Sequence, residues 1–215
     1  MTPFDPIAAL TDHQRDQLSR YAEELARVNR RFNLVAPSTI VDAERVHLRH
    51  SLALAWRAFP PGATVVDWGA GGGLPSVPLA IAFPDVRVVA VDSIAKKTRA
   101  VQFFSRRLGL DNLTAWNGRA EHYDGPAPTH AVSRATAPLA MLWAWTTRVL
   151  APSRLGTEAE DDAWRPGLYA LKGGDLTEEI AALPEGTEAE TTPLTEILGM
   201  GDETKALVAV REAWS

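Results

Sequence analysis

The sequence predicts an α/β fold with a mostly parallel sheet and helices on both faces. Short apolar runs alternate with segments of helical periodicity, which is typical of parallel strands joined by right-handed crossovers. The clearest stretch is 64–75, where an apolar strand leads into four glycines and then Pro75, which favours the first turn of a helix. No flexible linker interrupts the 215 residues, so we expect one domain, with residues 1–61 as a helical cap and residues 62–215 as the core.

The cap is predicted to contain two helices. Thr11 and Gln14 match a capping box, and apolar residues at helical spacing follow them. Residues 12–31 are therefore expected to form an amphipathic helix. A second apolar pattern predicts another helix that ends near residue 58, where prolines and a glycine close the cap.

The core is predicted to alternate strands with helices. The expected strands cover residues 64–67, 86–91, 113–116, 131–133 and 168–171. The expected helices cover residues 75–83, 137–150 and 175–183, together with a cation-rich helix after Asp92 that Gly109 closes. Residues 151–166 and 184–190 are expected to be an acidic loop and an acidic linker. Two apolar segments, 193–198 and 205–211, flank a glycine-containing turn and predict a C-terminal antiparallel hairpin.

Composition limits the classes of protein that fit. The chain has no cysteine, which suits a reducing cytoplasm and excludes disulfides, cysteine-ligated iron–sulfur clusters and a cysteine nucleophile. It also lacks a run of about 18 apolar residues, and its N-terminus has neither the basic nor the apolar region of a signal peptide. We therefore expect a cytoplasmic monomer that does not contact a membrane.

Charge is distributed unevenly along the chain. Residues 1–134 hold 16 Lys and Arg against 13 Asp and Glu, whereas residues 135–215 hold 6 against 14. The first segment is thus +3 and the second −8, which together give the net charge of −5. An acidic total argues against indiscriminate nucleic-acid binding, but it leaves room for a basic face on the first segment.

The glycine stretch predicts a site for a nucleotide-type cofactor. The dinucleotide fingerprint needs a sixth-position glycine, and counting from Gly69 that position is Leu74. A P-loop would need Gly-Lys-Ser/Thr, which is absent. Asp67 would repel a pyrophosphate, whereas S-adenosylmethionine carries an ammonium and a sulfonium and no phosphate. Asp67, Gly69 and Gly71 therefore favour S-adenosylmethionine as the cofactor.

The carboxyl ends of the other strands supply the remaining candidates, because ligands of open α/β sheets bind at that edge. Asp92 lies 23 residues past Gly69 and is expected to accept from ribose hydroxyls, although it could instead cap the next helix. Glu121 follows the third strand and could accept from an adenine amino group. Arg134 directly follows a buried strand, so it is either paired with a carboxylate or placed for a ligand; its position at this edge favours the ligand.

The histidines do not predict a metal site. His47 and His50 share a helical face, but no third ligand accompanies them at the spacing of a zinc site. We expect them to join Arg45 and Arg49 in a basic surface beside the cofactor, and we expect no bound metal.

Residue types and motifs that the sequence lacks exclude several acceptor atoms for the methyl group. Methylation of pyrimidine C5 uses a cysteine nucleophile, which is absent. Methylation of adenine or cytosine amino groups uses an Asn/Asp-Pro-Pro-aromatic motif after the fourth strand, where this chain continues from Ser133 to Pro138 without it. A ring nitrogen with a free lone pair needs no general base. Guanine N7 fits, and arginine or lysine recognises the adjacent O6 well.

Seven short motifs occur in one order along the chain. They are Asn33-Leu34-Val35-Ala36-Pro37-Ser38, Arg49-His50, the glycine stretch from Asp67 to Pro75, Val91-Asp92-Ser93 with Lys96-Lys97, Gly118-Arg119-Ala120-Glu121, Ser133-Arg134-Ala135 with Ala137-Pro138-Leu139, and Ala170-Leu171-Lys172-Gly173. Together they resemble a known family, the small-subunit ribosomal RNA guanine-N7 methyltransferases, also called the glucose-inhibited division protein B family. The resemblance covers most of residues 20–212.

This resemblance implies a bacterial cytoplasmic enzyme with a Rossmann-like class I methyltransferase fold. It implies transfer of a methyl group from S-adenosylmethionine to a guanine N7 of small-subunit ribosomal RNA, either free or in the assembled small subunit. Two departures stand out: Ser76 replaces a common glycine, and Ala53-Leu54 replaces a common Asp-Ser. The family positions that contact the cofactor correspond to Gly69, Leu74, Ala120, Glu121 and Arg134.

The mechanism expected from these residues is direct in-line displacement without an acid or base from the protein. Arg134 is expected to orient the cofactor or the target guanine. The acidic C-terminal segment is expected to face away from the RNA. The cations expected along the RNA are Arg27, Arg30, Arg31, Arg45, Arg49, Lys96 and Lys97.

Three alternative functions stay open at the level of sequence. The first is a methyltransferase that acts on a small molecule or a protein. The second is a nicotinamide-dependent oxidoreductase, against which stand Leu74 and the lack of a proton relay. The third is an RNA-binding module with a vestigial cofactor site, for which binding of S-adenosylmethionine would be undetectable.

Overall fold

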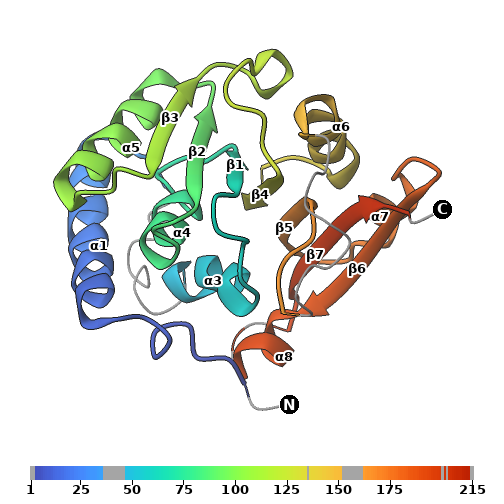
Figure 1. Ribbon diagram of the computed structural model, residues 1–215, viewed down its shortest axis with the longest axis horizontal. Coiled ribbons are helices and arrows are strands. Elements are labelled where there is room, and N and C mark those ends of the chain that lie inside the picture. The colour runs from blue at the N-terminus through green and yellow to red at the C-terminus, as the bar shows by residue number, and fades with distance from the viewer. Residues whose placement is uncertain are drawn as a thin grey trace.

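The protein is an α/β structure whose sheet has seven strands in the order β3-β2-β1-β4-β5-β7-β6 (Figure 1). The computed structural model describes residues 3–35, 47–134, 136–151, 162–199, 201 and 203–213. The strands are β1 (Thr64–Trp68), β2 (Arg87–Asp92), β3 (Leu113–Asn117), β4 (His130–Arg134), β5 (Gly167–Gly173), β6 (Thr187–Pro193) and β7 (Lys205–Glu212). The predicted fold class is confirmed, because β1 to β5 pair in parallel and β7 pairs antiparallel with both β5 and β6.

Helices cover both faces of this sheet. They are α1 (Asp12–Phe32), α3 (Arg49–Leu52), α4 (Ser76–Ala82), α5 (Ala95–Leu108), α6 (Leu139–Val149), α7 (Thr177–Ala181) and α8 (Leu194–Leu198), with short 3-10 turns η2 (Ala53–Trp56) and η3 (Ala120–His122). Alternation along β1 sends Val65 into one apolar cluster, with Tyr21 and Phe104, and sends Val66 into the other, with Leu142. The sheet is therefore buried on both sides, which explains why its strands are apolar runs.

The predicted first helix is confirmed as α1. Thr11 and Gln14 form the capping box, and Asn33 ends the helix with a left-handed backbone. The buried ring of Tyr21 packs edge-on against Phe104 at 5.3 Å, and its hydroxyl donates to Gly72 O at 2.8 Å. The N-terminal helix thus contacts the glycine turn directly. Of the second predicted helix, only the part from residue 47 lies within the described residues, where α3 and η2 are found.

The C-terminal hairpin exists, but one of its two predicted strands is wrong. Residues 194–198 form the helix α8, and the strand that pairs with β7 is β6, which had been predicted as an acidic linker. Leu194, Ile197 and Leu198 lie at helical spacing and are all buried. The strand β6 lies at the edge of the sheet, where alternate side chains are solvated and charged residues discourage pairing with another chain.

Within the described part of the chain, none of the helices has both the length and the hydropathy needed to cross a bilayer.

Candidate active site

The turn between β1 and α4 brings bare backbone to the carboxyl edge of the sheet. Gly69, Gly71 and Gly73 have φ values of 74°, 57° and 96°, which favour glycine over residues with a side chain. A Cβ at Gly69 would lie 2.1 Å from the Thr136 Cγ2 atom, so a larger residue would collide with the segment after β4. The amides of Gly69 and Ala70 both donate to Val91 O at 2.9 Å, which anchors the turn to β2.

A cavity of about 820 Å³ opens over this turn, and we call it the active-site cavity. Its volume lies within the range of small-molecule sites. Residues from five strand ends and from the segments that follow them contribute to its wall, as expected for a parallel sheet. Those predicted from sequence and found in the wall are Gly69, Gly71, Leu74, Asp92, Lys97, Ala120, Glu121 and Arg134.

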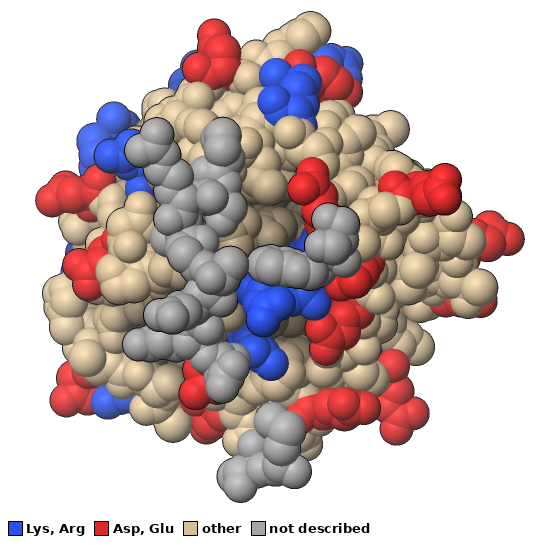
Figure 2. Space-filling view, turned by 45° about the vertical axis from the view of Figure 1, so that its right-hand side comes forward, with Lys and Arg blue, Asp and Glu red and all other residues tan. Residues whose placement is uncertain are grey.

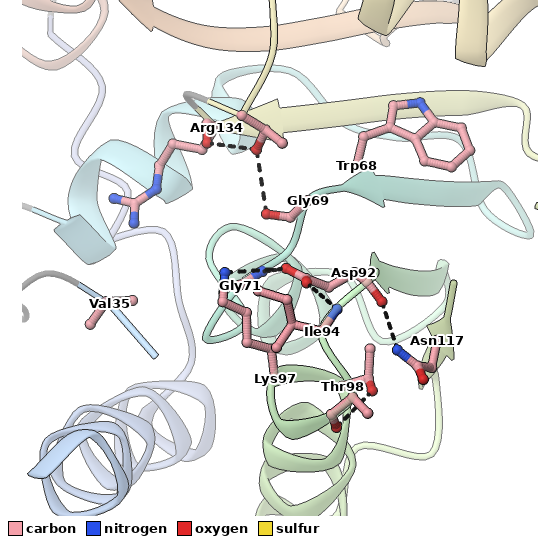
Figure 3. A network of polar contacts seen from close by, with 12 residues as sticks. Val35, Trp68, Gly69, Gly71, Asp92, Ile94, Lys97, Thr98, Asn117 and Arg134 are labelled. Atoms are coloured by element: carbon pink, nitrogen blue, oxygen red, sulfur yellow. Dashed lines mark hydrogen bonds and ion pairs between the residues drawn. The ribbon is translucent and has the colours of Figure 1, made fainter. Parts of the chain in front are cut away.

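Asp92 joins the end of β2 to the glycine turn. Its Oδ2 atom accepts from the Gly71 amide at 3.0 Å, and its Oδ1 atom accepts from the Ile94 amide at 2.9 Å (Figure 3). The ammonium of Lys97 lies 3.6 Å from Oδ2. The sequence left open whether Asp92 caps the next helix or faces a ligand. The geometry supports both, because the carboxylate holds the Ile94 amide before α5 and also lines the cavity.

Asp67 does not line the cavity, in contrast to its predicted contact with the cofactor. Its side chain is fully buried beneath the turn, where Oδ2 accepts from the Ser76 amide at 3.1 Å. Among the described residues, neither the other carboxylate oxygen nor the Ser76 hydroxyl has a hydrogen-bond partner. Burial raises the pKa of Asp67 to about 7, although the Ser76 amide and the charge of Arg134 oppose this rise.

Arg134 ends β4 on the other side of the Gly69 turn from Asp92 (Figure 3). Its Nη1 atom lies 3.1 Å from the His47 Nδ1 atom, and both side chains line the active-site cavity. Burial lowers the pKa of Arg134, while Tyr21 and Asp67 oppose that change. Because a guanidinium carries five N–H donors in a planar fork, Arg134 has donors beyond the one beside His47 with which to bind a ligand.

The wall beyond β3 is formed by the turn η3. Ala120 is buried, and its carbonyl accepts from the Arg148 Nη2 atom at 2.9 Å. Glu121, the next residue, is exposed and lines the cavity. Because Arg148 fixes the backbone of this turn, Ala120 can present backbone to a flat ring while Glu121 supplies an acceptor beside it.

Two lysines lie at the β5 side of the cavity: Lys172, a strand-end residue that belongs to one of the seven sequence motifs, and Lys205, which the sequence did not indicate. Lys172 donates to Ala137 O at 2.9 Å and pairs with the Glu179 carboxylate at 2.7 Å. Lys205 begins β7 and lies beside Gly173, its partner in the ladder. The antiparallel direction of β7 brings its first residue to the same edge as the last residues of β1 to β5. The sequence could not predict Lys205 as a site residue, because its place at this edge depends on the antiparallel pairing of β7 with β5.

The cations predicted to contact RNA are dispersed. Arg49 pairs with Asp5 at 3.1 Å, and Arg27 pairs with Glu24 while its guanidinium lies 5.7 Å from the centre of the Phe103 ring. Of the six predicted cations that lie within the described residues, only Lys97 lines the active-site cavity. Arg30, Arg31 and Lys96 are exposed on α1 and α5, and Arg45 lies outside the described residues.

No group of three or more histidines, cysteines, aspartates or glutamates gathers at metal-binding distance within the residues that the structure describes.

Comparisons with known proteins point to one family. A family described as rRNA small subunit methyltransferase G matches residues 14–208. A protein of Salinibacter ruber named ribosomal RNA small subunit methyltransferase G is 50% identical over 214 residues, which cover 97% of each chain. A protein of Chlorobium limicola with the same name is 37% identical over 172 residues, covering 80% of this chain and 73% of that protein.

Solved structures resemble this protein in fold. A mutant of MtNAS in complex with S-adenosylmethionine has a TM-score of 0.58 and is 14% identical, covering 93% of this chain and 73% of that one. Precorrin-6y C5,15-methyltransferase from Geobacter metallireducens has a TM-score of 0.55 and is 12% identical, covering 76% of this chain and 87% of that one. At these identities the likeness shows the fold alone.

Proposed function

The chain belongs to the rRNA small subunit methyltransferase G family, and on this basis we propose that it methylates N7 of a guanine in small-subunit ribosomal RNA. The methyl donor is S-adenosylmethionine. We locate the reaction at the carboxyl edge of the sheet because the active-site cavity lies there and is lined by the glycine turn, Asp92 and Arg134. The enzyme is expected to work in the cytoplasm as a monomer, on free rRNA or on the assembled small subunit.

The residues of the cavity fit S-adenosylmethionine at several points. Each oxygen of Asp92 accepts one backbone amide, so each keeps a lone pair for a ribose hydroxyl. The glycines at 69 and 71 leave room for the methionine part beside bare backbone. Leu74 and Ala120 offer apolar surface, and Glu121 offers an acceptor for the adenine amino group.

The chain's own contribution to the reaction is orientation and electrostatics. When bound, S-adenosylmethionine supplies an electrophilic methyl group, and guanine N7 holds a lone pair that attacks it without first losing a proton. Holding two reactants in line contributes roughly 7 to 11 kcal/mol, so no acid or base is required from the protein. Arg134, at the end of β4 between the two binding regions, is placed to hold one or both reactants.

The target base is proposed to enter from the side of Lys172 and Lys205, opposite Asp92. Guanine presents O6 beside N7, and both atoms are hydrogen-bond acceptors. Arg134 and Lys205 supply donors on that side of the cavity. The rest of the RNA would then extend over exposed cations of the first segment, including Arg30, Arg31 and Lys96.

Incubation of the protein with labelled S-adenosylmethionine and under-methylated small-subunit rRNA is expected to place label on one guanine N7. The reaction is run on free rRNA and on assembled small subunits, and the modified base is located by chemical cleavage at N7-methylguanine. Fully methylated subunits serve as the control and are expected to accept no label. Label on another atom, or none on either substrate, would contradict the proposal.

Replacement of Asp92 by asparagine is expected to weaken S-adenosylmethionine binding by about 10- to 100-fold, because charged acceptors contribute about 1.5 to 3 kcal/mol per hydrogen bond. Calorimetric titration measures this change. The matched control is Asp85→Asn, since Asp85 is exposed before β2 at the opposite edge of the sheet. Equal affinities in the two variants, with melting temperatures retained, would exclude a ribose contact by Asp92.

A further inference from the structure

A second cavity, of about 310 Å³, lies away from the active-site cavity, and we call it the arginine cavity. The two cavities share no lining residue. Leu207 and Ala209 of β7 contribute to its floor. Its polar and aromatic wall comes from Trp56, Arg57, Trp164, Arg165, Glu190 and Arg211.

The arginine cavity carries a positive charge. Among the described residues that line it, there are three guanidinium groups and one carboxylate, which together carry a net charge of +2. The Arg211 Nη2 atom lies 3.2 Å from the Glu190 Oε2 atom, and the Glu190 side chain is 69% exposed. A carboxylate so exposed is well solvated and is easily displaced by a stronger anionic partner.

The charges of the three arginines all act on the hydroxyl of Tyr169. Burial raises the pKa of the Tyr169 hydroxyl, and the charges of Arg211, Arg57 and Arg165 all oppose that rise. Tyr169 is fully buried beneath the cavity and donates its hydroxyl proton to the Arg165 carbonyl. Side chains from three separate segments therefore bring positive charge close to this buried hydroxyl, beneath the arginine cavity.

The aromatic part of the wall is rigid. The Arg57 guanidinium lies 5.3 Å from the centre of the Trp56 ring and 5.7 Å from that of Trp164. The Trp164 indole donates to Leu54 O at 2.8 Å, and its backbone amide donates to Ala58 O at 2.8 Å. Because the segments before Phe59 and before β5 are tied by these bonds, the cavity is formed before any ligand arrives.

The arginine cavity lies at the amino edge of the parallel strands, one strand length away from the active-site cavity at their carboxyl edge. Leu207, Ala209 and Arg211 alternate along one face of β7, whose first residue, Lys205, lines the active-site cavity. At about 3.3 Å per residue, Arg211 lies roughly 20 Å along the strand from Lys205. A small ligand cannot span that length, whereas a polynucleotide can.

Figure 2 looks at the molecule with the β6 and β7 side turned toward the viewer. Lys and Arg side chains gather near the centre of this face, and Asp and Glu side chains border them on one side. A polyanion on this face would be drawn to the basic centre and repelled from its acidic border.

We propose that the arginine cavity binds a phosphodiester of the ribosomal RNA substrate, several nucleotides from the methylated guanine. Guanidinium groups match phosphate oxygens with paired hydrogen bonds, and the half-buried Trp56 offers a ring beside them. This inference rests on the rRNA substrate of the proposed function. It also changes one expectation, because Arg165 and Arg211 belong to the acidic C-terminal segment that was expected to face away from RNA.

The test compares Arg165→Gln and Arg211→Gln with the control Arg87→Gln, since Arg87 is exposed at the start of β2. Affinity for under-methylated small-subunit rRNA is measured against KCl concentration, together with KM, kcat and S-adenosylmethionine affinity. Each cavity variant is expected to weaken RNA binding by about tenfold. The slope of log affinity against log salt is expected to fall by about one. The KM for rRNA is expected to rise, whereas kcat and cofactor affinity stay unchanged.

The outcomes separate this inference from the proposed function. If the unmodified protein methylates rRNA but the cavity variants bind RNA like Arg87→Gln, only the arginine cavity is excluded as an RNA contact. If inorganic phosphate raises the melting temperature in an Arg165-dependent manner while RNA affinity stays the same, the cavity holds a small anion and the inference is wrong. If the unmodified protein does not methylate rRNA, the proposed function itself fails.

Discussion

Replacement of Arg134 by alanine is expected to lower kcat/KM for rRNA methylation by about a hundredfold, the usual cost of removing one preorganised donor from an active site. Arg134 lies at the end of β4 between Asp92 and the lysines of β5 and β7, and it contacts His47 at 3.1 Å. Alanine removes both its charge and its fork of donors. Initial rates with under-methylated subunits, at several concentrations of each substrate, measure the effect.

Two further variants define what the arginine does. Arg134→Lys keeps the charge and loses the planar fork, so partial activity would assign the role to charge, and activity as low as that of alanine would assign it to geometry. Arg87→Ala, far from the cavity at the amino end of β2, is expected to match the unmodified protein. Wild-type kcat/KM and cofactor affinity in Arg134→Ala would show that its assigned role is wrong.

Replacement of Asp67 by asparagine is expected to stabilise the protein at pH 8 and to leave its stability unchanged near pH 4. Burial raises the pKa of Asp67 to about 7 in the folded protein, against an ordinary value of 3.8. Between these values the folded state holds a proton that the unfolded state has released. The free energy of unfolding therefore falls as pH rises from about 4 to about 7, and then stays level.

The size of this effect follows from the two pKa values. Their difference corresponds to an upper bound of roughly 4 kcal/mol, at about 1.4 kcal/mol per unit. Asparagine does not titrate, and its side-chain oxygen can accept from the Ser76 amide as the carboxylate does. Urea unfolding between pH 4.5 and pH 8.5, taken as the difference between variant and unmodified protein, cancels the contributions of other groups.

The same variant tests where Asp67 acts. Because Asp67 lies beneath the turn and not in the wall of the active-site cavity, Asp67→Asn is expected to bind S-adenosylmethionine with unchanged affinity. A large loss of affinity in a well-folded variant would mean that the buried carboxylate does serve the cofactor. A stability difference that does not vary with pH would contradict the raised pKa.

Most of the core was predictable because its signals are local. The glycine turn, Gly109 at the end of α5 and the capping box of α1 each depend on residues a few positions apart. The predictions for β6 and α8 are wrong because the secondary structure of these two segments depends on contacts with residues distant in the sequence. The edge position of β6 tolerates an acidic, solvated sequence, and the apolar residues of α8 reach the core only once η2 and β7 are in place.

The sequence alone determined that an α/β sheet carries a glycine turn, Asp92, Glu121 and Arg134 at one edge, because parallel strands all end on the same side. Tertiary structure alone decided which of these side chains face the cavity. Asp67 is fully buried beneath the turn, where it accepts from the Ser76 amide at the start of α4, although it stands directly before the turn in the sequence. Tertiary structure also brought Lys205 to the active-site cavity and gathered Arg57, Arg165 and Arg211 around a second one. The pairing of β5 with β7 and the bonds of Trp164 to Leu54 and Ala58 are what join segments so far apart in the chain.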